Sequence, residues 1–208
     1  MKNTYNFVAP YYSWLSYTVH GKDLINIQLD LIETLPDQGN ILIMGGGSGD
    51  IIPHLYKHSP HLKIDYIDAS SKMIALAQTK KTAGQQISFI HADTIPKPNY
   101  RYDAVFCAFF LDLYAEEEIL NWLSAFDAVC TPKYSLHVAD FQLNNSVKFR
   151  FWRMILIRLS ILFFKLTTNH STWKLEDIFT LIAKSNYKSI HVSYLKDNFL
   201  CLHVFKKL

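Results

Sequence analysis

Ile41-Leu42-Ile43-Met44-Gly45-Gly46-Gly47-Ser48-Gly49-Asp50 is a short apolar run that ends in a cluster of glycines, and it is the strongest indication of the fold. The four apolar residues predict a buried strand. The chain of 208 residues holds only 7 glycines, and four of them lie between residues 45 and 49. Glycine lets a backbone approach a ligand closely, and a helix that follows offers free N–H groups. The cluster therefore predicts a turn that faces a nucleotide-like ligand.

The spacing of the glycines excludes two common phosphate-binding loops. The dinucleotide pattern G-x-G-x-x-G would need a glycine in place of Asp50, Ile51 or Ile52. The P-loop would need Gly-Lys-Ser or Gly-Lys-Thr, which the chain does not contain. The pattern that is present is G-x-G-x-G. It still predicts a nucleotide-like ligand, but it is not the signature of a phosphate-binding loop.

From residue 40 onward, short apolar runs alternate with segments of helical length. Alternating strands and helices predict a parallel sheet with helices on both faces. The short turn 196–198 predicts a hairpin, so at least one strand at the C-terminal edge should be antiparallel. The expected strands are Ile41–Met44, Leu62–Ile67, Ile87–His91, Tyr102–Phe109, Tyr134–Ala139, Ser189–Leu195 and Phe199–Phe205, and the expected helices are Asp50–His58, Ser71–Lys81, Glu116–Val129 and Trp173–Ala183.

Composition favours one folded domain over residues 1–208. Hydrophobic residues make up 50% and charged residues 19%, which excludes a disordered chain. The three cysteines lack C-x-x-C spacing, which argues against zinc and redox motifs, and we expect no metal site. Unpaired cysteines and the absence of an apolar run at the N-terminus favour a cytoplasmic protein without a signal peptide.

Charge is divided unevenly along the chain. Residues 1–140 hold 10 Lys and Arg against 15 Asp and Glu, whereas residues 141–208 hold 11 against 3. The basic part includes the apolar segment 147–166, whose longest run without a charge is six residues, Leu159 to Phe164. A membrane span needs about 20 apolar residues, so this segment predicts a pocket wall or peripheral membrane contact. Its basic residues alternate with aliphatic ones, which argues against nucleic acid.

Two acids follow the next two expected strands. Asp68 ends the second strand, and Asp93 follows the third. An acid at the first position can accept both ribose hydroxyls of an adenosine ligand, and the second can accept the adenine amino group. A glycine loop and two acids at three consecutive strand ends predict an adenosine-binding site.

These motifs resemble class I S-adenosylmethionine-dependent methyltransferases. The stretch 41–50 is similar to the first motif of that family, 66–77 to the second, Asp93 to the third and 102–105 to the fourth. The segment 6–15 resembles the start of small-molecule methyltransferases of quinone biosynthesis. The resemblance covers nearly the whole chain and implies a Rossmann-like, doubly wound, seven-stranded, mostly parallel α/β sheet with an antiparallel C-terminal hairpin strand. It implies S-adenosylmethionine as cofactor, held by Tyr12, Gly45, Gly46, Gly47, Gly49, Asp68, Ala69, Met73, Asp93, Thr94, Ala108 and Phe109.

The resemblance departs from the family at Ile43, where an acid usually precedes the first glycine by two positions. The contact to the methionine amino group of the cofactor is then missing or supplied elsewhere, and Asp50 is one substitute. A protein that binds the cofactor without transferring its methyl group therefore stays open as an alternative.

The methyl-accepting side should lie at the carboxyl ends of the fourth and fifth strands, where open α/β sheets bind ligands. Candidate bases are Asp112, Asp140 and His20, whereas His91 should lie in the core. We expect residues 1–35 to form a helical lid and residues 145–185 a helical cover. The expected substrate is a phenol, quinone precursor, polyketide or lipid-like molecule, contacted by Tyr11, Phe110, Tyr114, Phe141 and Trp152.

Overall fold

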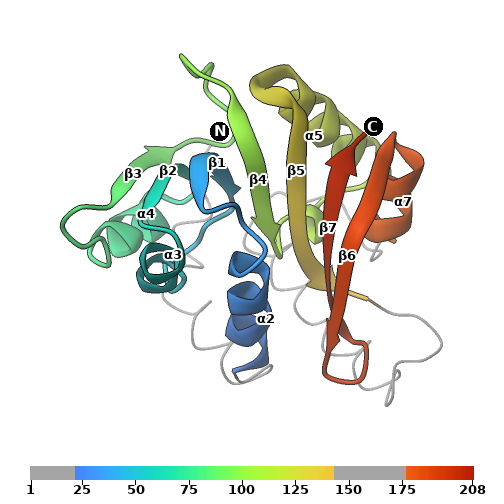
Figure 1. The fold of residues 1–208 in the computed structure, drawn as a ribbon, viewed down its shortest axis with the longest axis horizontal. Coiled ribbons are helices and arrows are strands. Elements are labelled where there is room, and N and C mark those ends of the chain that lie inside the picture. Colours follow the sequence, from blue (N-terminus) through green and yellow to red (C-terminus); the bar gives the residue numbers. More distant parts are fainter. Residues whose placement is uncertain (1–21, 143–176) are drawn as a thin grey trace.

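The computed structural model describes residues 22–142 and 177–208, which are built around one sheet of seven strands (Figure 1). The order of the strands is β3-β2-β1-β4-β5-β7-β6, so that β3 and β6 form the two edges. The elements are α2 (Asp23–Ile32), β1 (Gln38–Met44), α3 (Ile52–His58), β2 (His61–Asp68), α4 (Ser71–Gln78), β3 (Gln86–His91), β4 (Tyr102–Ala108), the 3-10 turn η1 (Leu111–Leu113), α5 (Glu116–Val129), β5 (Cys130–Phe141), α7 (Ile178–Lys184), β6 (Tyr187–Leu195) and β7 (Leu200–Lys207).

The sheet is mostly parallel, as the sequence predicts. Strands β1 to β5 pair in parallel, and β7 runs antiparallel to both β5 and β6. The hairpin turns at Lys196, Asp197 and Asn198, whose φ angles are 53°, 54° and 64°. Asp and Asn adopt this left-handed conformation more readily than most residues, which explains the tight turn. The expected α/β fold with an antiparallel strand at the C-terminal edge is confirmed.

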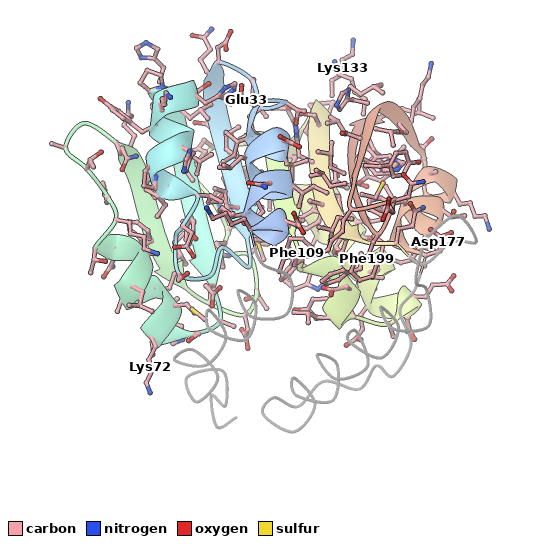
Figure 2. The ribbon with its side chains drawn as sticks, turned by 90° about the horizontal axis from the view of Figure 1, so that it is seen from below. Glu33, Lys72, Phe109, Lys133, Asp177 and Phe199 are labelled. Atoms are coloured by element: carbon pink, nitrogen blue, oxygen red, sulfur yellow. The ribbon has the colours of Figure 1, made fainter. Side chains whose placement is uncertain are left out.

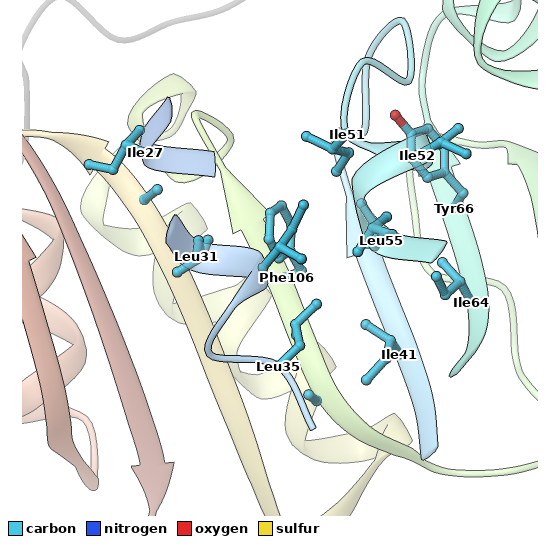
Figure 3. Packing of buried hydrophobic residues seen from close by; sticks show 14 of the residues in the cluster. Ile27, Leu31, Leu35, Ile41, Ile51, Ile52, Leu55, Ile64, Tyr66 and Phe106 are labelled. Atoms are coloured by element: carbon cyan, nitrogen blue, oxygen red, sulfur yellow. The ribbon is translucent and has the colours of Figure 1, made fainter. Parts of the chain in front are cut away.

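Helices cover both faces of the sheet. On one face, Ile27 and Leu31 of α2 and Leu55 of α3 are buried against Ile41 of β1 and Phe106 of β4 (Figure 3). On the opposite face, α5 and α7 pack on alternate residues of the same strands. Successive residues of a strand point to opposite faces, so β1 needs four consecutive apolar residues when both faces are covered. Because β1 is buried on both faces, the glycine loop that follows it is held at the carboxyl edge of the sheet.

Most elements differ from the expected bounds by one to a few residues, and two of these differences bear on the site. The helix expected from Asp50 begins at Ile52, because Asp50 belongs to the loop and the preceding glycine carries a positive φ of 82°. The strand expected over 134–139 extends over Cys130–Phe141, because it continues its pairing with β7 up to Phe141 and with β4 from Cys130. The longer β5 carries Asp140 and Phe141 to the carboxyl edge, beside the end of β4.

The predicted lid and cover fall largely outside the described residues. Within 1–35, residues 23–32 form α2, which packs on β5 and β7, and within 145–185, residues 178–184 form α7, which packs on α5 and β6. The remaining parts of both segments, including 147–166, belong to the ranges 1–21 and 143–176. None of the helices in the described ranges combines the length and apolar character that a membrane crossing requires.

Candidate active site

The glycine loop after β1 is shaped by its neighbours at three of its four glycines. A Cβ at Gly45 would lie 2.7 Å from the ring of Phe110, and one at Gly49 would lie 2.7 Å from Ala77. A Cβ at Gly46 would overlap the ring of Tyr66. At Gly47, whose φ is +65°, a Cβ would meet nothing within 4 Å. The loop is therefore tightly packed against the protein at Gly45, Gly46 and Gly49 and open at Gly47, which suits the close approach of a ligand.

Asp68 ties this loop to the end of β2. Its Oδ2 accepts a hydrogen bond from the Gly47 N–H at 2.8 Å, and its Oδ1 accepts one from the Ser70 N–H at 2.8 Å. Burial raises the pKa of Asp68, and the N–H groups of Ser70 and Gly47 and the charge of His91 offset this only in part. A carboxylate has about four lone-pair sites, so Asp68 keeps capacity to accept hydroxyl groups of a ligand.

Tyr66 supports the loop from the neighbouring strand. Its ring is fully buried beside Ile51 and Ile52 (Figure 3), and its hydroxyl donates a hydrogen bond to the carbonyl oxygen of Gly46. Burial, together with the negative charges of Asp68 and Asp50, raises the pKa of the phenol well above its ordinary value. Tyr66 therefore stays a neutral donor and holds the carbonyl of Gly46 in place.

The other predicted cofactor residues lie around this loop. Asp93 and Thr94 follow β3 and are exposed, whereas Ala69 is half-buried after β2. Met73 is buried in the first turn of α4, where its N–H donates to the hydroxyl of Ser70 at 3.3 Å. The strand ends thus bring Gly47, Asp68 and Asp93 to one edge of the sheet, in the order expected from the sequence.

The expectation that His91 lies in the core is wrong. His91 is exposed, and its Nε2 lies 3.1 Å from the carbonyl oxygen of Ala69. The physical reason is its position as the last residue of β3, an edge strand whose burial decreases toward its carboxyl end.

Ile43 and Asp50 bear on the missing acid of the first motif. Ile43 is fully buried, with its side chain in the core on the α2 face. Asp50 accepts hydrogen bonds from the Lys80 ammonium at 2.5 Å and from the Ser48 hydroxyl at 2.8 Å. Burial raises the pKa of Asp50, but the Lys80 and Ser48 bonds outweigh it and lower the pKa. Asp50 is thus engaged by Lys80 rather than held ready for a ligand amine.

The candidate bases Asp112 and Asp140 come together at the ends of β4 and β5. Asp140 is fully buried near the end of β5, and its Oδ2 accepts a hydrogen bond from the Asp112 N–H at 3.3 Å. Burial raises the pKa of both carboxyls, that of Asp112 to about 7, and the proximity of Asp112 raises that of Asp140 further. The third candidate, His20, lies outside the described residues, as do Tyr11, Tyr12 and Trp152.

The backbone at the end of β4 is strained. Phe109 has a φ of 53°, a conformation that is rare for a bulky residue, and its N–H donates to the carbonyl of Ala139 at 2.8 Å. Strained residues of this kind gather at functional sites. The turn sends Phe110 under Gly45 and leads directly into Asp112. Ala108 and Phe109, predicted to contact the cofactor, therefore stand between the glycine loop and the two carboxyls.

Aromatic side chains line the same edge in two groups. In the first, the Phe110 cluster, Phe110, Tyr114 and Trp122 pack with ring centroids between 5.1 and 5.7 Å apart. In the second, the Phe141 cluster, the Phe141 ring lies 5.1 Å from Phe109 and 5.3 Å from Phe199. Figure 2 shows Phe109 and Phe199 at the same edge of the sheet. Phe141 directly follows Asp140, and Phe110 and Tyr114 flank the turn η1 that carries Asp112.

Sequence reasoning missed Trp122 and Phe199. Trp122 lies on α5, where nothing in the pattern distinguishes it from an ordinary core residue. Phe199 could have been found, because β7 pairs antiparallel with β5 and places Leu200 opposite Phe141. Among the described residues, no group of three or more His, Cys, Asp or Glu side chains is arranged to hold a metal ion.

A family described as a methyltransferase domain matches residues 41–133, which span β1 to the beginning of β5. This stretch, somewhat less than half of the chain, is therefore similar to a methyltransferase domain. The matched residues of this domain include the glycine loop, Asp68, Asp93 and Asp112. A resemblance to quinone-biosynthesis enzymes in particular is not part of this finding.

Solved structures share the fold of the methyltransferase domain. TnmH aligns with a TM-score of 0.70 at 16% identity over 94% of this chain, and the pyocyanin biosynthetic protein PhzM with 0.68 at 14% over 95%. The N-methyltransferase NodS from Bradyrhizobium japonicum WM9, solved in complex with S-adenosyl-L-homocysteine, aligns with 0.67 at 14% over 99% of this chain and 99% of its own.

These likenesses concern the fold. The chain spans 57% of the length of TnmH and 62% of that of PhzM. Because 1072 solved chains match significantly, the fold alone selects no acceptor. Comparison with curated proteins finds no significant match.

Proposed function

We propose that this domain transfers the methyl group of S-adenosylmethionine to a hydrophobic small molecule. The observation that carries the proposal is the glycine loop, which is open at Gly47 and fixed there by the Asp68 carboxylate at 2.8 Å. Asp93 follows the adjacent strand end. A loop without a phosphate-binding signature, followed by two acids, suits an adenosine ligand that carries no phosphate.

The described residues fit this cofactor. Asp68 would accept the ribose hydroxyls, and Asp93 would accept the adenine amino group. Gly47 keeps the loop free of a side chain at the ligand's approach. S-adenosylmethionine supplies a methyl group on a positively charged sulfur, which a nucleophile displaces directly. The protein then has to align the nucleophile and exclude water, and alignment alone can supply effective molarities of about 10⁵–10⁸ M.

The acceptor side supports an apolar, aromatic substrate. The Phe110 cluster and the Phe141 cluster present rings on both sides of the turn at Phe109. Ligand pockets are lined mainly by apolar and aromatic side chains with a few polar groups. A phenol, quinone precursor, polyketide or lipid-like molecule fits this lining. The similar protein PhzM is named for pyocyanin biosynthesis, which supports a small-molecule acceptor.

Incubation with S-adenosylmethionine and a panel of phenols, hydroxyquinones, polyketides and fatty acids tests the proposal. We expect S-adenosylhomocysteine and a methylated acceptor to form together, as followed by mass spectrometry. Asp68→Ala should abolish turnover, whereas the matched control Asp103→Ala should keep it. Asp103 also binds a backbone N–H, that of Asn40 at 2.9 Å, but at the amino end of β4. Equal turnover by wild type and Asp68→Ala would contradict the proposal.

One observation favours a second candidate, a protein that binds the cofactor without transferring its methyl group. The position of the family's usual acid is the buried Ile43, and Asp50 is engaged by Lys80. Tight binding of S-adenosylmethionine without product from any acceptor of the panel would favour this candidate. Formation of a methylated acceptor would exclude it.

A further inference from the structure

Two carboxyl groups, one fully buried and one partly buried, meet at the carboxyl edge of the sheet. Asp140 is 0% exposed and is the last but one residue of β5, and Asp112 is in the turn η1 that follows β4. The same turn packs Phe110 under Gly45 of the glycine loop. The two carboxyls therefore lie close to the glycine loop and next to aromatic residues at the edge where open α/β sheets bind ligands.

Hydrogen-bond donors are distributed unevenly over the pair. Asp140 accepts from the Phe141 N–H at 2.8 Å through Oδ1 and from the Asp112 N–H at 3.3 Å through Oδ2. The Oδ1 of Asp112 is enclosed and has no hydrogen-bond partner in the described ranges. An enclosed carboxyl oxygen without a partner is costly unless a proton or a ligand satisfies it.

No positively charged side chain among the described residues acts on the two carboxyls. The titratable groups that face Asp140 are Asp112 from η1, the Cys107 thiol from β4 and the Cys201 thiol from β7. Asp177, which precedes α7, and Tyr194 of β6 act on Cys201. Among residues 22–142 and 177–208, no Lys, Arg or His contributes to the pKa of either carboxyl. Two adjacent carboxyls whose described neighbours include no cation each disfavour the ionised form of the other.

We propose that Asp112 and Asp140 share one proton and together take up the proton that the methyl acceptor releases, so that the acceptor enters as a neutral hydroxyl compound. This inference rests on the proposed methyl transfer. The acceptor oxygen forms a bond to the methyl carbon, and the carbon–sulfur bond breaks with its electron pair on sulfur, which becomes a neutral thioether. The hydroxyl proton moves to a carboxylate oxygen of the pair, which then holds two protons.

The charges of this step cancel. Before transfer, the pair carries one negative charge and the sulfonium one positive charge, and afterwards both are neutral. Loss of both charges together favours the reaction in a low-dielectric site, where isolated charges are costly. A substrate that arrives as an anion would meet the charge of the pair instead. The pair thus selects phenols and enols that are neutral in solution.

Infrared difference spectra test the shared proton without any substrate. At about pH 8, one unit above the pKa of about 7 of Asp112, wild type should show the carbonyl band of one protonated carboxyl. The band should disappear in Asp140→Asn, because Asp112 alone is mostly ionised at this pH. In Asp112→Asn, burial keeps Asp140 protonated, but the band should shift because its proton is no longer shared, so either folded variant tests the pair. The control Asp65→Asn should keep the band, because Asp65 is a buried acid on β2 that accepts from the hydroxyls of Tyr100 and Tyr102. A band that persists in Asp140→Asn, or that stays unshifted in Asp112→Asn, would overturn the shared proton.

Kinetics test the proton uptake. With substituted phenols of graded acidity, kcat/KM of wild type should rise about tenfold per pH unit below about pH 7 and then level off. Asp112→Asn should lose about 10²–10⁴-fold with the least acidic phenols and much less with the most acidic ones. Chelation with EDTA should have no effect. An equal loss for all phenols, or inhibition by EDTA, would overturn the proton uptake.

Calorimetry distinguishes a failure of the shared proton or of the proton uptake from a failure of the proposed methyl transfer. Asp112→Asn and Asp140→Asn should bind S-adenosylhomocysteine, whose sulfur is neutral, within about threefold of wild type, because neither carboxyl is part of the adenosine site. If wild type binds S-adenosylmethionine but methylates no acceptor, the proposed function fails, and the infrared result still decides whether the proton is shared.

Discussion

Replacing Gly47 with alanine should separate ligand binding from stability. The φ of Gly47 is +65°, where a Cβ would meet no atom within 4 Å, so the substitution introduces backbone strain without a clash. A left-handed conformation costs an L-residue about 1–2 kcal/mol. For a domain of this size, 1 kcal/mol lowers Tm by about 2–4 °C, so we expect a loss of about 2–8 °C.

Gly84 offers a matched control for this strain. Its φ is +88°, and a Cβ there would lie 3.4 Å from the hydroxyl of Tyr56, in ordinary contact and far along the chain from the loop. Gly84→Ala should therefore lower Tm by a similar amount. Only Gly47→Ala should weaken the binding of S-adenosylmethionine, because its Cβ would occupy the open side of the loop where the ligand approaches.

Thermal melts and calorimetric titration with S-adenosylmethionine measure the two effects. We expect Gly47→Ala to bind at least about tenfold more weakly than wild type, which corresponds to about 1.4 kcal/mol, and Gly84→Ala to bind as wild type does. Undiminished binding by Gly47→Ala would refute the assignment of the open side of the loop to the cofactor. Equal weakening in both variants would attribute the effect to strain alone.

Three further predictions concern packing, pH and membranes. Gly46→Ala should prevent folding or severely lower Tm, because the new Cβ would overlap the buried ring of Tyr66, and circular dichroism should show this. Because the pKa of Asp112 is raised in the folded state, the wild type loses stability as the pH rises and this carboxyl ionises. Near pH 4 the carboxyl is protonated, so Asp112→Asn should match wild type in unfolding free energy. Above pH 7 it should exceed wild type by up to about 4 kcal/mol in urea titrations, whereas a variant that gains nothing would contradict the raised pKa of about 7. The membrane hypothesis for residues 147–166, which lie outside the described residues, predicts sedimentation with anionic vesicles at low salt, and its failure there would dismiss the hypothesis.

Much of the fold could be predicted from the sequence, because the decisive features are local. Four apolar residues followed by glycines can only be a strand buried on both faces that ends in a tight turn, and Asp68 and Asp93 follow strands of similar clarity. The hairpin before Phe199 is equally local, since Asp197 and Asn198 tolerate left-handed backbone. These features also placed Asp112 and Asp140 at the edge where ligands bind.

The contacts that shape the site could not be predicted, because they depend on how distant segments pack. The hydrogen bond from the Gly47 N–H to Asp68 joins residues 21 positions apart, and it requires the exact course of the loop. The burial of Asp140 depends on the continuation of β5 and on the turn at Phe109. Trp122 gave no local signal, since an aromatic residue on a core-facing helix is ordinary.

Calorimetric titration of wild type and Asp68→Ala with S-adenosylmethionine tests whether the glycine loop and Asp68 form the cofactor site. Asp68 is the carboxylate that fixes the loop at Gly47, and hydrogen bonds to a charged group contribute about 1.5–3 kcal/mol. We predict one binding site in wild type with a Kd below about 100 µM, within the usual range of enzyme KM values. Asp68→Ala should bind at least about tenfold more weakly, and Asp103→Ala should bind like wild type. Absence of binding to wild type, or equal binding by Asp68→Ala, would contradict the account.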